Sequence, residues 1–158
     1  MSPRYSDILI DHFNHPRNAG VLAVPDGVGK AGQGDHEYVV IQIRVREDAV
    51  AEIAQQAAGC EPAVASASMA TELAKGKHLD EASLITQDTI ASALGGLPAD
   101  KCHTAGLAAE ALANAIMDYV LRCVEKQHSP QRSQRTQSRK KNSNGEETTK
   151  DPVNEDAS

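Results

Sequence analysis

The chain of 158 residues has very few aromatic side chains: three tyrosines, one phenylalanine and no tryptophan. A core without large rings must be built from small aliphatic side chains, so we expect its helices to pack closely. No apolar run approaches the ~20 residues needed to span a bilayer, and the first residues do not resemble a signal peptide. The sequence therefore predicts a soluble, cytoplasmic protein, one domain with an appendage, that has no membrane partner.

Cysteine is also scarce, and the count of three is odd. We expect these residues to be thiols or metal ligands rather than disulfides. The net charge of −6 is unevenly spread, because residues 127–158 hold six Lys/Arg and five Asp/Glu and so leave −7 on residues 1–126. Such an acidic body argues against a nucleic-acid partner. No G-x-G-x-x-G leads from a strand into a helix, so a dinucleotide site is not expected.

The hydrophobic pattern changes along the chain from alternation to helical spacing. Strands followed by helices are typical of an α+β fold, here a small three-stranded antiparallel sheet covered on one face by helices. In chain order we expect an N-terminal helix capped by Ser6 or Asp7, then within residues 21–35 an edge strand that leads into an exposed loop over 31–35, and strands over 36–46 and 50–58. Helices are expected over 61–75, 79–84, 87–94 and 104–125, the third of them capped by the Thr86 hydroxyl.

Residues 127–158 differ sharply from what precedes them. Polar and charged residues dominate, with no aromatic residue and a single Val153 as large aliphatic. Such a segment cannot bury enough apolar area to offset its chain entropy. We therefore predict a folded domain over 1–126 and a disordered polar tail over 127–158. The basic run 139–141 is interpreted as part of the solvated tail.

The most informative stretch surrounds Cys60, which follows Gly59 and precedes Glu61-Pro62. Proline is tolerated in the first turn of a helix, so the helix is expected to begin here. The helix dipole and the free N–H groups at that end favour a thiolate over a thiol. The alternative is an inert, buried cysteine at a strand-to-helix junction, and residue type alone favours it.

Two further loop ends carry side chains that bind metals. Asp35 lies in the glycine-rich segment, and Cys102-His103 immediately precede the last helix. Together with Cys60 these donors suit zinc or iron. The spacing is weak evidence, since there is no C-x-x-C pair. A thiol enzyme with Cys60 as nucleophile and His103 as base is a further alternative.

Other histidines and the last cysteine are expected to be structural. His12, His15, His36 and His78 are interpreted as surface or capping residues, with His36 as a spare ligand near the glycine-rich loop. Cys123 lies on the apolar stripe of the last helix and is expected in the core.

Several segments resemble, in the same order, the NifU-like (IscU-type) scaffold proteins of iron–sulfur cluster assembly. The resemblance covers about residues 4–126. It implies a scaffold or carrier, not an enzyme with turnover, that binds iron or a labile cluster and accepts sulfur. The segments that carry it are Tyr5-Ser6, Asp11-His12, Pro16-Arg17-Asn18-Ala19-Gly20, Gly59-Cys60, Ala65-Ser66-Ala67-Ser68 and Lys101-Cys102-His103.

The family holds its cluster, or a zinc ion in its place, with three cysteines, an aspartate and a histidine. Its Cys-Gly-Asp motif corresponds here to Gln33-Gly34-Asp35, and its His-Cys motif to His103-Thr104. The resemblance therefore implies Asp35, Cys60 and His103 as ligands, with Cys102 as a substitute for the cysteine lost at Thr104.

The two lost thiolates change what the site is expected to hold. Fe–S clusters are held by thiolates, so one or two cysteines make a poorer site for a [2Fe-2S] cluster than for ferrous iron or zinc. The resemblance implies a cysteine desulfurase that donates sulfur to Cys60, and iron–sulfur acceptor proteins. The alternative is a degenerate paralogue that serves as an interaction or regulatory module without cluster binding.

One partner of the family, a chaperone, is not clearly implied for this chain. Many members have a Leu-Pro-Pro-Val-Lys segment that a dedicated Hsp70-type chaperone recognises. The corresponding segment here is Leu97-Pro98-Ala99-Asp100-Lys101, with an aspartate in place of an apolar residue. Docking to such a chaperone is therefore placed in doubt.

Overall fold

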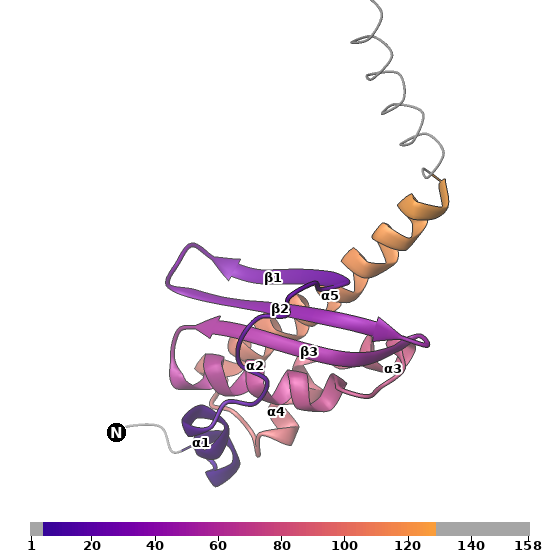
Figure 1. The fold of residues 1–158 in the computed structure, drawn as a ribbon. Coiled ribbons are helices and arrows are strands. Elements are labelled where there is room, and N and C mark those ends of the chain that lie inside the picture. The colour runs from indigo at the N-terminus through magenta and orange to yellow at the C-terminus, as the bar shows by residue number, and fades with distance from the viewer. Residues whose placement is uncertain (1–4, 129–158) are drawn as a thin grey trace, which may run out of the picture. The chain divides into compact units, whose positions relative to one another are not determined.

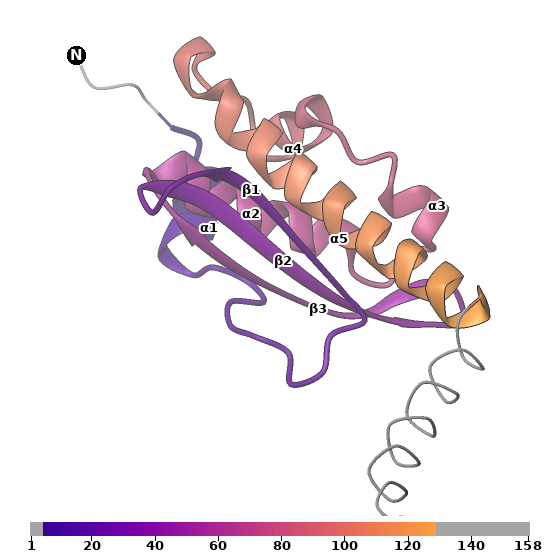
Figure 2. The ribbon, with the colours of Figure 1, turned by 90° about the horizontal axis from the view of Figure 1, so that it is seen from above.

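The structure, a computed structural model, describes residues 5–128 (Figure 1). The predicted α+β class is confirmed, with three antiparallel strands and helices on one face (Figure 2). No helix among the described residues is long and apolar enough to cross a membrane. The elements are α1 (Asp7–Asn14), β1 (Gly27–Gln33), β2 (Glu37–Arg46), β3 (Ala49–Ala58), α2 (Glu61–Ala74), α3 (Leu79–Ala82), α4 (Gln87–Ala93), a 3-10 turn η1 (Ala99–Lys101) and α5 (Cys102–His128).

The chain divides into two compact units, residues 1–121 and 122–158, and α5 runs from the first into the second. All contacts discussed below lie within the first unit. The tail predicted over 127–158 lies, from residue 129 onward, outside the described residues, so the boundary at 126 stays a prediction.

Helix starts follow the predicted capping pattern. Ser6 Oγ accepts a hydrogen bond from the Leu9 N–H at 3.0 Å and caps α1. Thr86 Oγ1 accepts one from the Thr89 N–H at 3.2 Å and caps α4. Each hydroxyl satisfies an amide that has no partner within its helix, which fixes where the helix begins.

The strand order β1-β2-β3 places two chain segments at one end of the sheet. A turn over residues 34–36 joins β1 to β2, with Gln33 directly opposite Glu37. On the other side of β2, Tyr38 is opposite Ala58, the last residue of β3. The β1–β2 turn and the chain leaving β3 are therefore neighbours. We call this region, residues 33–37 with 58–60, the turn end of the sheet.

The two faces of the sheet are covered differently. The side chains of Val39, Ile41 and Ile43 are fully buried, as their alternation predicted. Figures 1 and 2 show the helices on one side of the sheet and the segment between α1 and β1 on the other. That segment is attached by backbone groups: the Leu22 N–H donates to Gln42 Oε1 at 2.7 Å.

Helix α2 is buried along almost its whole length. Its alanines are small enough to bring the helix backbone close to the sheet, as the scarcity of large side chains predicted. α2 also contacts α1, α3 and α4. The fully buried alanines of α2 are Ala63, Ala65, Ala67, Ala70 and Ala74.

Gly27 and Gly29 of β1 have a packing role that the sequence did not indicate. A Cβ atom at Gly27 or Gly29 would collide with the backbone of α5, so glycine permits the helix to lie against β1. Asp118 of α5 accepts a hydrogen bond from the Val28 N–H at 2.9 Å, and Asn114 Nδ2 donates to the Lys30 carbonyl at 3.0 Å. The expected loop over 31–35 was therefore partly wrong, because β1 extends to residue 33.

Candidate functional site

Cys60 lies at the N-terminus of α2, where the sequence placed it. It is the N-cap residue, it is followed by Glu61 and Pro62 in the first turn, and its side chain makes no capping bond. Its carbonyl accepts hydrogen bonds from the Ala63 and Val64 N–H groups at 3.0 and 3.2 Å. The thiol is only partly buried. The backbone is thus engaged in starting the helix, while the sulfur remains accessible at its positive end.

A carboxylate that sequence reasoning missed lies against this thiol. Cys60 Sγ donates to Glu37 Oε2 at 3.7 Å. His103 Nε2 lies 3.3 Å from both oxygens of the same carboxylate. The side chain of Glu37 is 33% exposed and that of His103 is 53% exposed. β2, the start of α2 and the start of α5 each contribute one side chain to this group, which we call the Cys60–Glu37–His103 cluster.

Gly59 makes room for the cluster. A Cβ atom at this position would lie 3.0 Å from Glu37 Cγ and 3.2 Å from Ala63 Cβ, and the residue has a φ of +138°. An L side chain rarely adopts that backbone conformation. The glycine before Cys60 therefore both turns the chain and allows the Glu37 side chain to lie across the junction.

Sequence signals for Glu37 were present but weak. The alternation that buries Val39 and Ile41 places Glu37, two residues before Val39, on the same helix-covered face. A charged residue on that face at the end of a strand is unusual and has to find polar partners. The partners themselves, at positions 60 and 103, come from distant parts of the chain.

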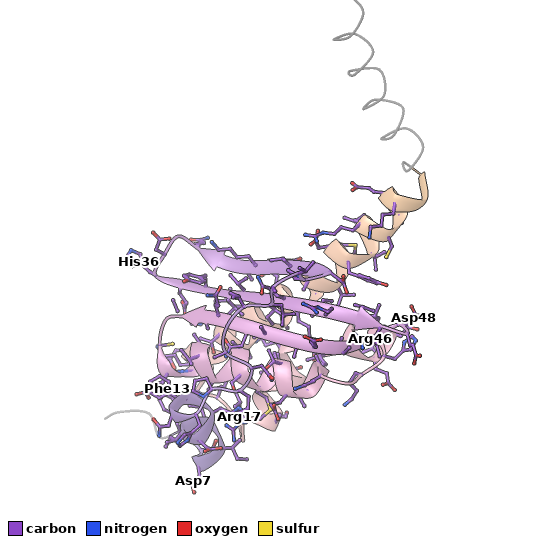
Figure 3. The ribbon with its side chains drawn as sticks, in the orientation of Figure 1. Asp7, Phe13, Arg17, His36, Arg46 and Asp48 are labelled. Carbon is purple, nitrogen blue, oxygen red and sulfur yellow. The ribbon has the colours of Figure 1, made fainter. Side chains whose placement is uncertain are left out.

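Asp35 occupies a different place from the cluster. It is exposed in the β1–β2 turn, between Gly34 and His36. Figure 3 shows His36 at the tip of that turn, at the opposite end of the sheet from Arg46 and Asp48. Asp35 is therefore at the same end of the sheet as Cys60, as expected, but it is not among the side chains that contact the thiol.

Cys102 and Thr104 flank His103, and each is hydrogen-bonded to a backbone carbonyl of the turn that precedes α5. Cys102 Sγ lies 3.5 Å from the Pro98 carbonyl oxygen, within the turn that leads into α5. Thr104 is fully buried, and its hydroxyl donates to the Lys101 carbonyl at 2.8 Å. In residues 5–128 no three His, Cys, Asp or Glu side chains are already grouped to hold a metal ion. The donors at this end are therefore near one another without forming a finished site.

His12 was expected at the surface, and this expectation was wrong. It is only 8% exposed, and its Nδ1 lies 2.7 Å from Ser68 Oγ of α2. Ser68 Oγ also accepts the Arg17 N–H at 2.8 Å, and the tautomer of His12 decides which partner donates in the His12–Ser68 hydrogen bond. Burial lowers the pKa of His12, and the nearby Arg17 charge lowers it further, against the opposing effects of Asp11 and Glu72.

Of the remaining expectations for single residues, those for three histidines are confirmed and the one for Cys123 is not. His15, His36 and His78 are exposed, as expected, and His78 caps α3 by accepting the Asp80 N–H at 3.2 Å. Cys123, expected in the core, is only partly buried.

The fold and its end groups define a class: a small α+β domain that presents a thiol, a carboxylate and an imidazole from three elements at one end of its sheet. The model of the family described as the NifU-like N terminal domain matches residues 4–126. The chain belongs to this family.

Curated relatives and solved structures agree with that assignment. The chain is 49% identical over 118 residues to "Iron-sulfur cluster assembly scaffold protein IscU 1" of Archaeoglobus fulgidus, covering 73% of this chain and 76% of the relative. It is 42% identical over 122 residues to the IscU scaffold protein of Azotobacter vinelandii, covering 73% of this chain and 93% of the relative. These relatives are named as scaffold proteins, not as enzymes.

Two solved structures share the fold. The N-terminal NifU-like protein of Brucella abortus has a TM-score of 0.55 at 18% identity, covering 72% of this chain and 92% of that one. A putative iron–sulfur cluster assembly scaffold protein of Fervidobacterium islandicum has a TM-score of 0.57 at 16% identity, covering 71% and 96%. At these identities the likeness concerns the fold alone.

Proposed function

We propose that this protein is a scaffold or carrier in iron–sulfur cluster assembly, which binds iron, a labile cluster or zinc at the turn end of its sheet. The observation that carries the proposal is the accessible Cys60 thiol at the start of α2, with a carboxylate and an imidazole beside it. Family membership and the names of the relatives support the same role.

Cys60 is the principal metal ligand and the sulfur acceptor in this proposal. A thiolate is the nucleophile in sulfur transfer, and the N-terminal end of a helix stabilises it. The Cys60 thiolate attacks the terminal sulfur of a persulfide on a cysteine desulfurase. The S–S bond of the donor breaks, its cysteine leaves as a thiolate, and Cys60 becomes the persulfide. No external oxidant or reductant is needed.

His103 and a carboxylate complete the coordination of the metal cargo. Asp35 is the carboxylate that the resemblance implies, and Cys102 is an additional thiol. Cys102 could join the site only by leaving the Pro98 carbonyl, its present hydrogen-bond acceptor. A set with one or two thiolates suits a single iron or zinc ion, or a [2Fe-2S] cluster that is readily released to an acceptor protein.

The decisive experiment uses Cys60→Ser, with Cys123→Ser as the matched control and Cys102→Ser as the test of the additional thiol. Each protein is purified without oxygen, its bound iron and zinc are measured, and it is treated with a persulfide donor before its persulfide is trapped. We expect Cys60→Ser to lose both metal and persulfide while its melting temperature stays within a few degrees of the wild type. Unchanged metal and persulfide in this variant would refute the proposal.

A second candidate function follows from the unfinished arrangement of the donors. Because no three-donor group is already formed in residues 5–128, the chain could have kept the fold as an interaction or regulatory module. Reconstitution with iron and sulfide under anaerobic conditions separates the two candidates. Visible charge-transfer absorption that requires Cys60 supports the carrier. A colourless protein that also contains no zinc as purified supports the module.

A further inference from the structure

We infer that Glu37, and not Asp35, supplies the carboxylate ligand at this site. The inference rests on the proposed function and assigns one of its ligands. Neither the motif comparison nor the residue spacing pointed to Glu37. Three features of the structure support its assignment: strand register, donor separations and the space above Gly59.

The first observation is strand register. Glu37 is the first residue of β2, opposite Gln33 of β1 and next to Tyr38, whose partner is Ala58 at the end of β3. This places Glu37 beside the chain that continues into Cys60. Asp35 is two residues further out, in the exposed turn that joins β1 to β2.

The second observation is the separation of the donor atoms. Metal bonds of about 2.0–2.3 Å in a tetrahedral arrangement require oxygen–nitrogen separations of about 3.3 Å and oxygen–sulfur separations of about 3.6 Å. The Glu37 oxygens lie 3.3 Å from His103 Nε2, and Oε2 lies 3.7 Å from Cys60 Sγ. Two of the three ligand pairs therefore already have the spacing of a tetrahedral site, and Glu37 belongs to both.

The third ligand pair is Cys60 with His103. No direct hydrogen bond joins these two side chains within the described residues, so their separation would adjust when a metal binds. The His103 side chain is 53% exposed, so its ring can rotate toward the sulfur with little displacement of other atoms. This accounts for the absence of a finished three-donor group in the described residues. A metal that must draw its last protein ligand into place is bound less tightly than one in a rigid site, which suits a carrier that releases its cargo.

The third observation is the space above Gly59. Because this residue has no Cβ, the Glu37 side chain can lie across the junction, and a Cβ atom would be 3.0 Å from Glu37 Cγ. The position is thus shaped around Glu37, whereas the side chain of Asp35 is exposed.

The donor set also has a definite chemistry. One thiolate, one carboxylate and one neutral imidazole carry a charge of −2, which balances a single divalent ion. Mixed sulfur, nitrogen and oxygen ligands suit zinc or ferrous iron. A fourth position is left for water, for sulfide or for the persulfide on Cys60.

The test is a titration with Co²⁺, a coloured substitute for zinc, on anaerobic full-length protein. Wild type, Glu37→Gln, Glu37→Asp, Asp35→Asn and Cys60→Ser are compared by the thiolate-to-cobalt absorption and by affinity. We expect Glu37→Gln to weaken binding by about tenfold or more, since loss of even a supporting residue costs 10–100-fold. Glu37→Asp, which keeps the charge, should lose less, and Asp35→Asn should stay within about twofold.

The outcomes separate the inference from the function on which it rests. If Cys60→Ser loses the cobalt band while Glu37→Gln binds as the wild type does, the site exists and Glu37 is not its ligand. Asp35→Asn weakening binding with Glu37→Gln unaffected would assign the carboxylate to Asp35. No cobalt binding by the wild type would overturn both statements. Circular dichroism of each variant confirms that the fold is retained.

Discussion

The middle of α2 and its N-terminal end use polar side chains in opposite ways. In the middle of the helix, Ser66, Ser68 and Thr71 are fully buried. Their hydroxyls are hydrogen-bonded to other elements or within the helix: Ser68 to His12 and Arg17, and Thr71 to the Ser68 carbonyl at 2.7 Å. At the N-terminal end, Cys60 and its neighbours Glu37 and His103 are partly exposed, with separations of 3.7 Å between Cys60 and Glu37 and 3.3 Å between Glu37 and His103.

The difference is between polar side chains that are held by one set of hydrogen-bond partners and polar side chains that can exchange theirs. A buried group with short bonds is held in one arrangement, and losing its partner costs the full desolvation energy. A partly exposed group with long contacts can exchange its partner for water or a ligand at small cost. Residue type alone does not separate the two, since Cys, Ser, His and Glu occur in both settings across proteins.

The largest effect on stability is expected from Ser68→Ala. The change removes the partner of the buried His12 ring nitrogen and of the partly buried Arg17 N–H, and each such loss costs about 1–3 kcal/mol, so we expect the free energy of unfolding to fall by about 2–4 kcal/mol. Cys60→Ala, the matched change at the end of the helix, should cost within about 1 kcal/mol. Urea denaturation of both variants measures this. Equal losses would abolish the distinction between the two regions.

Gly59→Ala sharpens the comparison because the residue directly precedes the exposed N-terminal end of α2. The added Cβ requires a strained backbone at φ +138° and crowds Glu37, so we expect a stability loss of about 1–3 kcal/mol. Cobalt affinity should fall as well, because the Glu37 carboxylate is displaced. Gly34→Ala, where a Cβ would meet no atom within 4 Å at a φ of +63°, is the control for backbone strain alone. If both variants bind cobalt equally well, Gly59 has no role in positioning Glu37.

The smallest effect is a pH dependence that comes from the buried region. Because the folded-state pKa of His12 lies below its ordinary value of 6.5, the unfolded chain takes up a proton first as the pH falls. Stability from this group is complete above pH 6.5 and is lost as the pH drops through the folded-state pKa, by at most about 1.4 kcal/mol per pH unit. Unfolding measured from pH 7.5 to 5 in wild type and His12→Gln isolates it. Identical pH profiles would contradict this assignment.

Most of the fold could be predicted from local patterns. The alternation through Val39, Ile41 and Ile43, the proline after Cys60 and the capping hydroxyls of Ser6 and Thr86 are features of neighbouring residues, and each determined an element. Gly27 and Gly29 of β1 gave no local sign of their packing role. Their reason is the close approach of α5, which comes from more than 80 positions away in the chain.

The site could be predicted only in part, for the same reason. Cys60 and His103 lie at helix starts, which local patterns reveal, and the structure places both against one carboxylate. That carboxylate belongs to Glu37, and its partners are 23 and 66 residues away. His12 was misjudged in the same way, since its partner Ser68 is 56 residues distant. Sequence spacing gives no access to such pairs.

Both margins of the sheet are partly occupied: Asp118 accepts a hydrogen bond from β1 and Asn114 donates one to it, while residues 18–20 pair with Gln55 of β3. This affects how the sheet can interact with other chains. Open strand edges are templates on which other chains add and aggregate. Here both margins of the sheet have side-chain or backbone partners at these positions. The end of the sheet that carries Cys60 can therefore stay accessible while the two margins of the sheet offer fewer places for unwanted strand addition.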